Sequence, residues 1–170
     1  MKEIIYNYDD VDENEINRIV RRAKALIIND KNEVVLALSH NNYYFIGGHV
    51  DNDESDFECL IREIKEESGV DIDIKPMKPF LRIKYLNKDY PSEGVNTMSL
   101  ANYYLLKTNL EENKKERTLT DSEEDGDFHI VNIPLYDSVK VLTDSIPNST
   151  RQGAVLDTIE AIKEYINISN

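Results

Sequence analysis

Three glutamates have the spacing that brings side chains together on one face of a helix. Glu63, Glu66 and Glu67 lie at positions i, i+3 and i+4, and residues at these spacings are neighbours on a helix surface. Like charges at this distance repel, although Arg62 can offset part of the repulsion by pairing with Glu58 or Glu66. A divalent cation such as Mg²⁺ is a stronger counter-charge, because it binds carboxylate oxygens and keeps positions open for water and phosphate. The spacing therefore predicts a metal site with positions open for water and phosphate.

The chain around these glutamates has the start and stop signals of a helix from Asp56 to Ser68. Ser55 and Glu58 have the spacing of a capping box, and Gly69 is the residue type that most easily adopts the left-handed conformation ending a helix. Apolar residues at i, i+3, i+4 and i+7 form a second face, which is expected to pack on the core. These residues are Phe57, Leu60, Ile61 and Ile64.

This segment resembles the Nudix box, a family signature of the form G-x5-E-x7-R-E-U-x-E-E-x-G-U in which U is apolar. Every position is filled, by Gly48, Glu54, Arg62, Glu63, Ile64, Glu66, Glu67, Gly69 and Val70. The context agrees, because a predicted strand ends at a double glycine and is followed by a loop and a capped helix. Ile46 stands where many family members have a proline. That departure concerns the geometry of the loop rather than the metal ligands.

The resemblance implies a fold and an activity. The expected fold is a Nudix-type α/β/α sandwich with a mixed central sheet, formed by one domain over residues 1–170 with the box at 48–70. The expected activity is hydrolysis of a nucleoside diphosphate linked to another group, with water attacking a metal-bridged phosphate. The cofactor would be Mg²⁺, which Mn²⁺ can replace.

The resemblance also implies roles for individual residues of the box. The expected metal set consists of Glu63, Glu66, Glu67, Glu54 and the carbonyl of Gly47. Within it, Glu63 is either a further ligand or the base that activates water, and Glu54 binds metal through water or orients the loop. Arg62 would hold a neighbouring glutamate in place, so that Arg62, Glu63 and Glu67 form the expected catalytic set.

Family members often use one more acidic residue from a loop far downstream. The candidates are Glu111, Glu112, Glu116, Glu123 and Glu124, and the sequence gives no basis for choosing among them. They lie in the highly charged stretch from Glu111 to Asp127, which has little to bury and is expected to be a solvated loop or hairpin end.

Residues that select the substrate lie outside the conserved spacing of the box. His49 is placed to donate a hydrogen bond to a phosphate, and Tyr85, which follows Gly69 by 16 residues, resembles a tyrosine of family members that act on diadenosine polyphosphates. Aromatic residues on predicted strands are candidates to stack on a nucleobase, although alternation makes at least half of them core residues. They are Tyr43, Tyr44, Phe45, Tyr85, Tyr103 and Tyr104.

The remaining elements are predicted from hydrophobic periodicity. A short helix is expected from Asp12 to Arg22, where Asp12 and Glu15 have capping-box spacing, and a C-terminal helix is indicated by a periodic apolar face. That face consists of Val155, Ile159, Ile162 and Ile166. Strands are expected at Ala23 to Ile28, Val34 to Ser39, Tyr43 to Ile46, Phe80 to Leu86, Ser99 to Lys107 and Phe128 to Ile133.

Composition limits the class of partner. The chain has 33 acidic and 20 basic residues and a formal charge of -13, which disfavours binding to DNA or long RNA. Cys59 is the single cysteine, so it is expected to be a buried thiol without chemistry. No segment has the length and apolarity of a signal peptide or a membrane span. We therefore expect a cytoplasmic protein, a monomer or homodimer, and the resemblance to the Nudix family implies a small phosphorylated nucleotide-type substrate.

Two alternatives to a small-molecule pyrophosphohydrolase remain open. A catalytically silent nucleotide sensor of the same fold would bind a ligand but show no turnover with either metal. A pyrophosphohydrolase of RNA 5′ ends should carry a basic surface track, which the composition disfavours.

Overall fold

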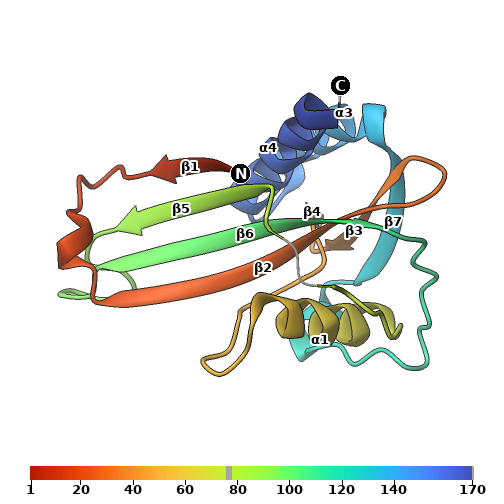
Figure 1. Ribbon diagram of the computed structural model, residues 1–170, viewed down its shortest axis with the longest axis horizontal. Helices are drawn as coiled ribbons and strands as arrows, with labels where there is room; N and C mark the ends of the chain where they lie inside the picture. Colours follow the sequence, from red (N-terminus) through yellow and green to blue (C-terminus); the bar gives the residue numbers. More distant parts are fainter. Residues whose placement is uncertain (76–77, 170) are drawn as a thin grey trace.

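The computed structural model describes residues 1–75 and 78–169 (Figure 1). A seven-stranded sheet has the order β1-β5-β6-β2-β3-β4, and β7 pairs with β3. The strands are β1 (Lys2–Tyr6), β2 (Arg18–Ile28), β3 (Glu33–Ser39), β4 (Asn42–Tyr44), β5 (Leu81–Asn87), β6 (Thr97–Lys107) and β7 (His129–Pro134). The pairs β1/β5 and β2/β6 are parallel and the others are antiparallel. The sheet is therefore mixed, as expected.

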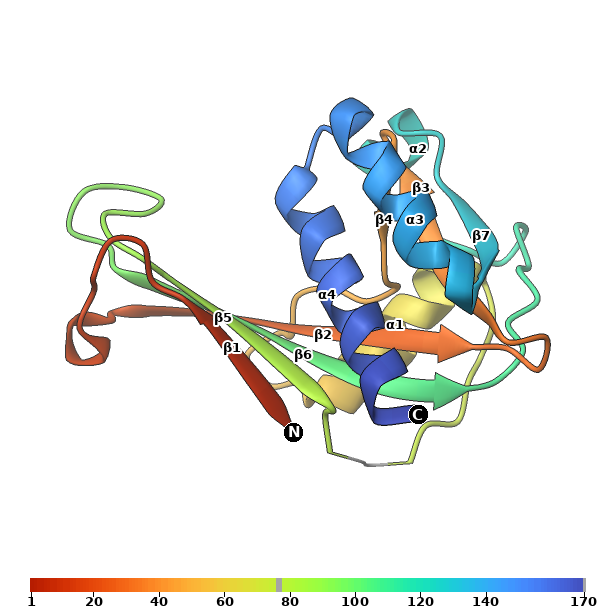
Figure 2. The same ribbon diagram turned by 90° about the horizontal axis from the view of Figure 1, so that it is seen from above.

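Helices cover both faces of this sheet. They are α1 (Asp56–Ser68), α2 (Asp121–Asp125), α3 (Leu135–Ser145) and α4 (Gln152–Ser169), with 3₁₀ turns η1 (Glu13–Glu15) and η2 (Ile146–Asn148). Figures 1 and 2 show α1 against one face and the pair α3 and α4 against the other. This arrangement confirms the predicted α/β/α sandwich.

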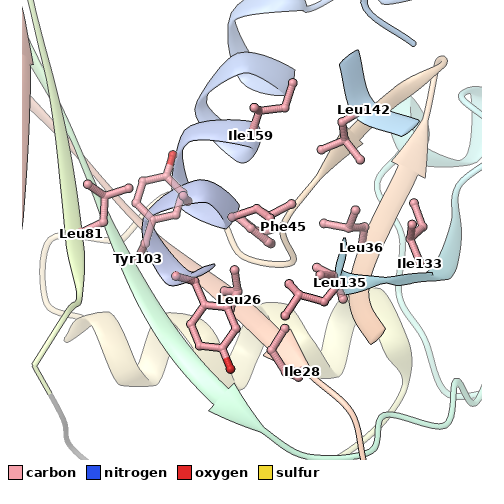
Figure 3. Packing of buried hydrophobic residues seen from close by; sticks show 14 of the residues in the cluster. Leu26, Ile28, Leu36, Phe45, Leu81, Tyr103, Ile133, Leu135, Leu142 and Ile159 are labelled. Carbon is pink, nitrogen blue, oxygen red and sulfur yellow. The ribbon is translucent and has the colours of Figure 1, made fainter. Parts of the chain in front are cut away.

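Each face of the sheet has its own apolar core. Along β2, Leu26 joins the cluster under α3 and α4, whereas Ile27 joins the cluster over α1, because successive side chains of a strand point to opposite faces. Figure 3 shows the first cluster, to which Leu26 of β2, Phe45 and Ile159 of α4 all belong. Leu60 of α1 belongs to the second. Burial of one such side chain contributes about 1.5 to 3 kcal/mol. Apolar packing therefore holds α1 against one face of the sheet and α4 against the other.

The prediction of a helix from Asp12 to Arg22 was wrong. The cap is present, since the Asp12 carboxylate accepts a hydrogen bond from the Asn14 backbone N–H at 2.8 Å, but it starts only the single turn η1. From Arg18 onward the chain pairs in parallel with β6 over the whole length of β2. Ladder hydrogen bonds and β-branched residues favour the extended conformation there. Figure 2 shows this end of the sheet extending beyond the helices.

The other predicted elements are confirmed, with small shifts of their boundaries. The strand expected to end at Ile46 ends at Tyr44, and the charged stretch from Glu111 to Asp127 contains the short helix α2. Neither β1 nor α3 was predicted. Three residues of the predicted apolar face of α4, Val155, Ile159 and Ile162, are buried. No helix within residues 1–75 and 78–169 is long and apolar enough to cross a membrane.

Candidate active site

Helix α1 begins and ends where its sequence signals predict. The Ser55 hydroxyl accepts a hydrogen bond from the Glu58 backbone N–H at 3.3 Å, and the Glu58 carboxylate accepts one from the Ser55 backbone N–H at 2.8 Å. Gly69 ends the helix in the left-handed conformation, with φ of 74°. These caps satisfy backbone groups that a helix end leaves unpaired.

A buried carboxylate ties the first turn of α1 to the sheet. Asp56 accepts hydrogen bonds from Arg21 at 2.6 Å, from the Asn102 amide at 2.7 Å and from the Tyr104 hydroxyl at 2.7 Å. Burial alone raises the pKa of Asp56, but these donors outweigh it and lower the pKa below its usual value. Sequence reasoning missed this anchor, because its partners come from β2 and β6, far away along the chain.

The buried face of α1 is rotated relative to the predicted one. Leu60 and Ile64 are fully buried, as expected, but Ile61 is 37% exposed, so the prediction that it faces the core was wrong. The helix turns Glu67 under the sheet, leaving that side chain only 3% exposed. The same rotation moves Ile61 to the solvent edge of the apolar stripe.

Arg62 connects the acidic residues of the site. Its guanidinium donates to both oxygens of Glu54 at 2.9 and 3.0 Å, to Glu63 at 2.8 Å and to Glu66 at 3.2 Å. It also donates to the His49 carbonyl at 3.1 Å. Hydrogen bonding to Glu54 is the main cause that raises the pKa of Arg62, and the same bonds lower the pKa of Glu54. One cation therefore fixes three carboxylates.

Glu67 is the least solvated carboxylate of the site. One oxygen, Oε1, accepts a long hydrogen bond from the Gly47 N–H at 3.5 Å, whereas Oε2 is buried without a hydrogen-bond partner. Burial raises the pKa of Glu67 to about 8, against the opposing charge of Lys24. Burial also raises the pKa of Glu63, although Arg62 opposes it. A cation at this point would relieve both burial penalties.

The double glycine allows the loop to approach α1 closely. Gly47 has φ of 126°, and a Cβ there would collide with the carbonyl of Ala23. At Gly48, a Cβ would occupy the place of the Glu63 carboxylate. Glycine is therefore required at position 47 for its positive φ and at position 48 for the space that the Glu63 carboxylate occupies.

A lysine lies beside the Gly47 carbonyl. The Lys24 ammonium on β2 donates to the Gly47 carbonyl and, at 3.4 Å, to the Phe45 carbonyl, and it lies 5.7 Å from the centroid of the Tyr44 ring. Burial lowers the pKa of Lys24, and the charges of Glu67 and Glu63 oppose that shift. Sequence reasoning missed this residue, although a lysine within the apolar run of β2 was a visible signal.

These groups form one end of a pocket of about 730 Å³ between α1, the sheet and α4. At the other end, the Tyr85 hydroxyl donates to Asp157 of α4 at 2.5 Å, and the Tyr85 ring stacks on Tyr6 with centroids 4.8 Å apart. Burial raises the pKa of Asp157 to about 6, opposed by the Tyr85 bond and the charge of Arg22. We call the first end of the pocket, with Glu63, Glu67, Gly47 and Gly48, the carboxylate end. We call the second end, with Tyr85, Tyr103 and Asp157, the tyrosine end.

The sequence-predicted substrate residues both line the pocket. Tyr85 is partly buried at the tyrosine end. His49 is exposed, and its Nε2 lies 3.0 Å from the Arg22 guanidinium. Partial burial and the nearby Arg22 lower the pKa of His49, so its ring is neutral and Nε2 accepts from Arg22. A hydrogen bond to a phosphate would then have to come from Nδ1.

The other candidate site residues fall into two groups, those that line the pocket and those that do not. Among the five downstream acidic residues, Glu123 lines the pocket, whereas Glu111, Glu112, Glu116 and Glu124 do not. Of the aromatic set, Tyr44, Phe45, Tyr85 and Tyr103 line it. Tyr104 points to the opposite face, where it binds Asp56, and Tyr43 packs against the core. Glu66 is not part of the pocket wall, and its carboxylate bonds to Arg62.

Buried Cys59 has the role expected of it. Its side chain is fully buried, and burial raises the pKa of its thiol to about 12. A thiol with so high a pKa is neutral and unreactive at neutral pH.

The residues present fit a hard divalent cation. Glu67 Oε2 is a buried acceptor without a partner, and Glu63 and the Gly47 carbonyl on the same pocket wall are further oxygen donors, the type that Mg²⁺ prefers. Among the residues that the structure describes, no group of three or more His, Cys, Asp or Glu side chains is arranged to hold a metal ion. Lys24 and Arg62 bind groups of this set in the structure.

Comparison with known proteins agrees with this geometry. The chain matches the NUDIX domain over residues 18–139. A similar solved structure is the MutT protein from Methanosarcina mazei Go1, with a TM-score of 0.53 and 15% identity over 87% of this chain and 95% of that one. The MutT NUDIX hydrolase from Burkholderia pseudomallei has a TM-score of 0.51 and 17% identity over 71% of this chain and 86% of that one. Curated protein sequences gave no match. The domain match, together with the shared fold, shows that this chain belongs to the Nudix family.

Proposed function

We propose that this protein is a metal-dependent pyrophosphohydrolase that cleaves a diphosphate linkage in a small nucleotide-type molecule. One observation carries the proposal. The unpartnered Oε2 of Glu67 lies on the same wall as Glu63 and the Gly47 carbonyl, at one end of a pocket of about 730 Å³. That volume lies within the range of small-molecule sites, so a substrate phosphate and a cation can meet at the carboxylate end.

The residues of the carboxylate end have separate tasks in this proposal. Bound Mg²⁺ or Mn²⁺ would supply a Lewis acid that lowers the pKa of water and offsets phosphate charge. Glu67, Glu63 and the Gly47 carbonyl would hold it, with Glu123 as the additional acidic residue. Arg62 keeps Glu63 oriented through its bond at 2.8 Å. Because burial raises the pKa of Glu63, this residue is suited to accept a proton from the attacking water.

The rest of the pocket suits the remainder of a nucleotide. Arg22 and Lys24 both line the pocket, where they can offset phosphate charge. Tyr85 and Tyr103 offer aromatic surface at the tyrosine end. We therefore place the phosphates toward α1 and the organic group toward α4.

A turnover assay tests this function. Purified protein is incubated with nucleoside triphosphates, dinucleoside polyphosphates and nucleotide sugars, with and without Mg²⁺, and released mononucleotide or phosphate is measured. Wild-type protein should turn over at least one class only when metal is present. Glu67→Gln should lose this activity by at least about 100-fold, whereas Glu116→Gln, on an exposed residue away from the pocket, should retain it. Absence of turnover across the panel with both Mg²⁺ and Mn²⁺ would refute the enzymatic proposal.

A second candidate function is a nucleotide sensor without turnover. It is favoured by the position of Lys24, whose ammonium binds the Gly47 carbonyl, the oxygen expected to complete the metal site. In that case the same panel should show binding by calorimetry and no product. The RNA-end alternative has less support, because Arg22, Lys24 and Arg151 line one pocket rather than a surface track of the kind that follows a nucleic acid backbone.

A further inference from the structure

Lys24 lies at the carboxylate end of the pocket. Its ammonium donates to the carbonyls of Gly47 and Phe45. It also faces the charges of Glu67 and Glu63, so both a carbonyl and two carboxylates of the carboxylate end are within its field. Lys24 comes from β2 and is not part of the Nudix box, whose residues run from Gly48 to Val70.

We propose that Lys24 is a resident cation that competes with the divalent metal for the carboxylate end. The inference rests on the proposed metal-dependent function. An ammonium and a divalent metal on the same Gly47 carbonyl oxygen would repel each other, so loading favours the departure of Lys24 from that carbonyl. Lys24 therefore sets the free metal concentration at which the site fills.

The charges of the site make this competition substantial. Without Lys24 or a metal, Glu67 is a carboxylate that is 3% exposed and has one oxygen without a hydrogen-bond donor. The positive charge of Lys24 offsets that charge in a buried setting, where Coulomb interactions exceed those in water. The metal-free protein is thus stabilised by Lys24, and the metal must replace that stabilisation before it gains any of its own.

Arg22 provides an internal comparison. It lies two residues earlier on β2, on the same face, and it lines the same pocket with the same charge. Its guanidinium contacts His49 at 3.0 Å, and the structure gives it no bond to the Gly47 carbonyl. A general electrostatic effect of the cationic wall would therefore involve both residues, whereas direct competition involves Lys24 alone.

Measured metal affinity distinguishes direct competition by Lys24 from a general charge effect of the pocket wall, and it does not depend on enzymatic turnover. Binding of Mn²⁺ alone is measured by calorimetry and by electron paramagnetic resonance for wild-type protein, Lys24→Met and Arg22→Met. We expect Lys24→Met to bind Mn²⁺ about tenfold more tightly or better. Arg22→Met should differ from wild type by less than about threefold, because Arg22 bonds to His49 and not to the Gly47 carbonyl. Lys24→Gln is included as a second neutral variant in case the methionine variant folds poorly.

Thermal unfolding provides the second measurement. Metal-free Lys24→Met should unfold at a lower temperature than metal-free wild type, and saturating Mn²⁺ should raise its midpoint by more than it raises that of wild type. Unchanged or weaker Mn²⁺ binding by both Lys24 variants, with wild type binding normally, overturns the competition but leaves the proposed function intact. Absence of Mn²⁺ binding in wild type and in all variants overturns both proposals. A gain of equal size in Arg22→Met also rejects direct competition, because it assigns the effect to the net charge of the pocket wall.

Discussion

The two ends of the pocket differ in how their residues are distributed along the chain. The carboxylate end comes from one contiguous segment, residues 47–67, in which Gly47, Glu63 and Glu67 are placed by a loop and one helix. The tyrosine end joins Tyr85 of β5 to Asp157 of α4, separated by 72 positions. The NUDIX domain match covers residues 18–139 and so includes the first end completely but excludes Asp157.

Under the proposed function, this difference separates the residues of the chemical step from those that select the substrate. Helical spacing alone fixes the relative positions of Glu63 and Glu67, so any chain that forms this helix presents the same carboxylates. The relation of Tyr85 to Asp157 instead depends on strand register and on how α4 packs over the sheet. Changes at the two ends should therefore have different consequences, and four experiments measure this.

The largest expected effect is a loss of stability of the metal-free protein as the pH rises, caused by the ionisation of Glu67. Because burial raises its pKa from 4.5 to about 8, the folded state holds the proton more tightly than the unfolded chain does. Its stabilising contribution is complete below pH 4.5 and is lost as the pH rises through about 8. We expect wild-type protein in a chelator to lose on the order of several kcal/mol relative to Glu67→Gln over this range. Urea unfolding of both proteins at a series of pH values measures it, and parallel curves would contradict it.

The second effect concerns Arg62, which binds Glu54, Glu63 and Glu66. Arg62→Met leaves these carboxylates without their shared cation, so metal affinity and kcat should each fall by about 10 to 100-fold. Arg82→Met is the control, because Arg82 pairs with Glu3 at 3.8 Å and bonds to Asn102, away from the pocket wall. Calorimetry with Mn²⁺ and the turnover assay provide the data. Equal losses in both variants would mean that Arg62 has no special relation to the site.

The contrast between residues placed by nearby chain and residues placed by distant partners also explains how much could be predicted from the sequence. The bounds of α1, both of its caps and the carboxylates of its inner face follow from short-range rules, since each depends on residues within one or two turns. The helix predicted from Asp12 to Arg22 failed for the opposite reason. Local spacing there suits a helix, but pairing with β6 along the entire strand β2 outweighs it, and that partner lies some 80 residues downstream.

Residues missed within the site also depend on distant partners. Asp56 is one more acidic residue in an acidic chain until β2 and β6 bring Arg21, Asn102 and Tyr104 to it. Glu123 could not be distinguished from its charged neighbours, because only the position of α2 brings it to the pocket. Such contacts follow from tertiary packing, which a single sequence does not specify in a readable form.

The third effect tests the tyrosine end. Asp157→Asn keeps the size of the side chain but changes its hydrogen bond with Tyr85, so the organic group should bind less well. We expect KM for the preferred substrate to rise about tenfold with kcat changed by less than about threefold, the pattern of lost uniform binding. Glu160→Gln, three residues later on α4 and outside the pocket wall, should leave both constants unchanged. A fall in kcat at constant KM would instead place Asp157 among the groups that act in the chemical step.

The smallest effect compares the N-cap residues of two helices. Ser55, before the 13-residue helix α1, accepts a hydrogen bond from the Glu58 backbone N–H. Thr120, before the five-residue helix α2, makes no such side-chain bond, and its hydroxyl donates to the Glu123 carboxylate instead. Ser55→Ala should reduce the free energy of unfolding by about 1 kcal/mol, because α1 packs against the core and its first turn cannot fray without disturbing Asp56. Thr120→Ala should cost less, because α2 has no buried residue and its fraying exposes little apolar surface. Urea unfolding measures both. A greater loss for Thr120→Ala would show that α2, and with it Glu123, is held more firmly than its exposure implies.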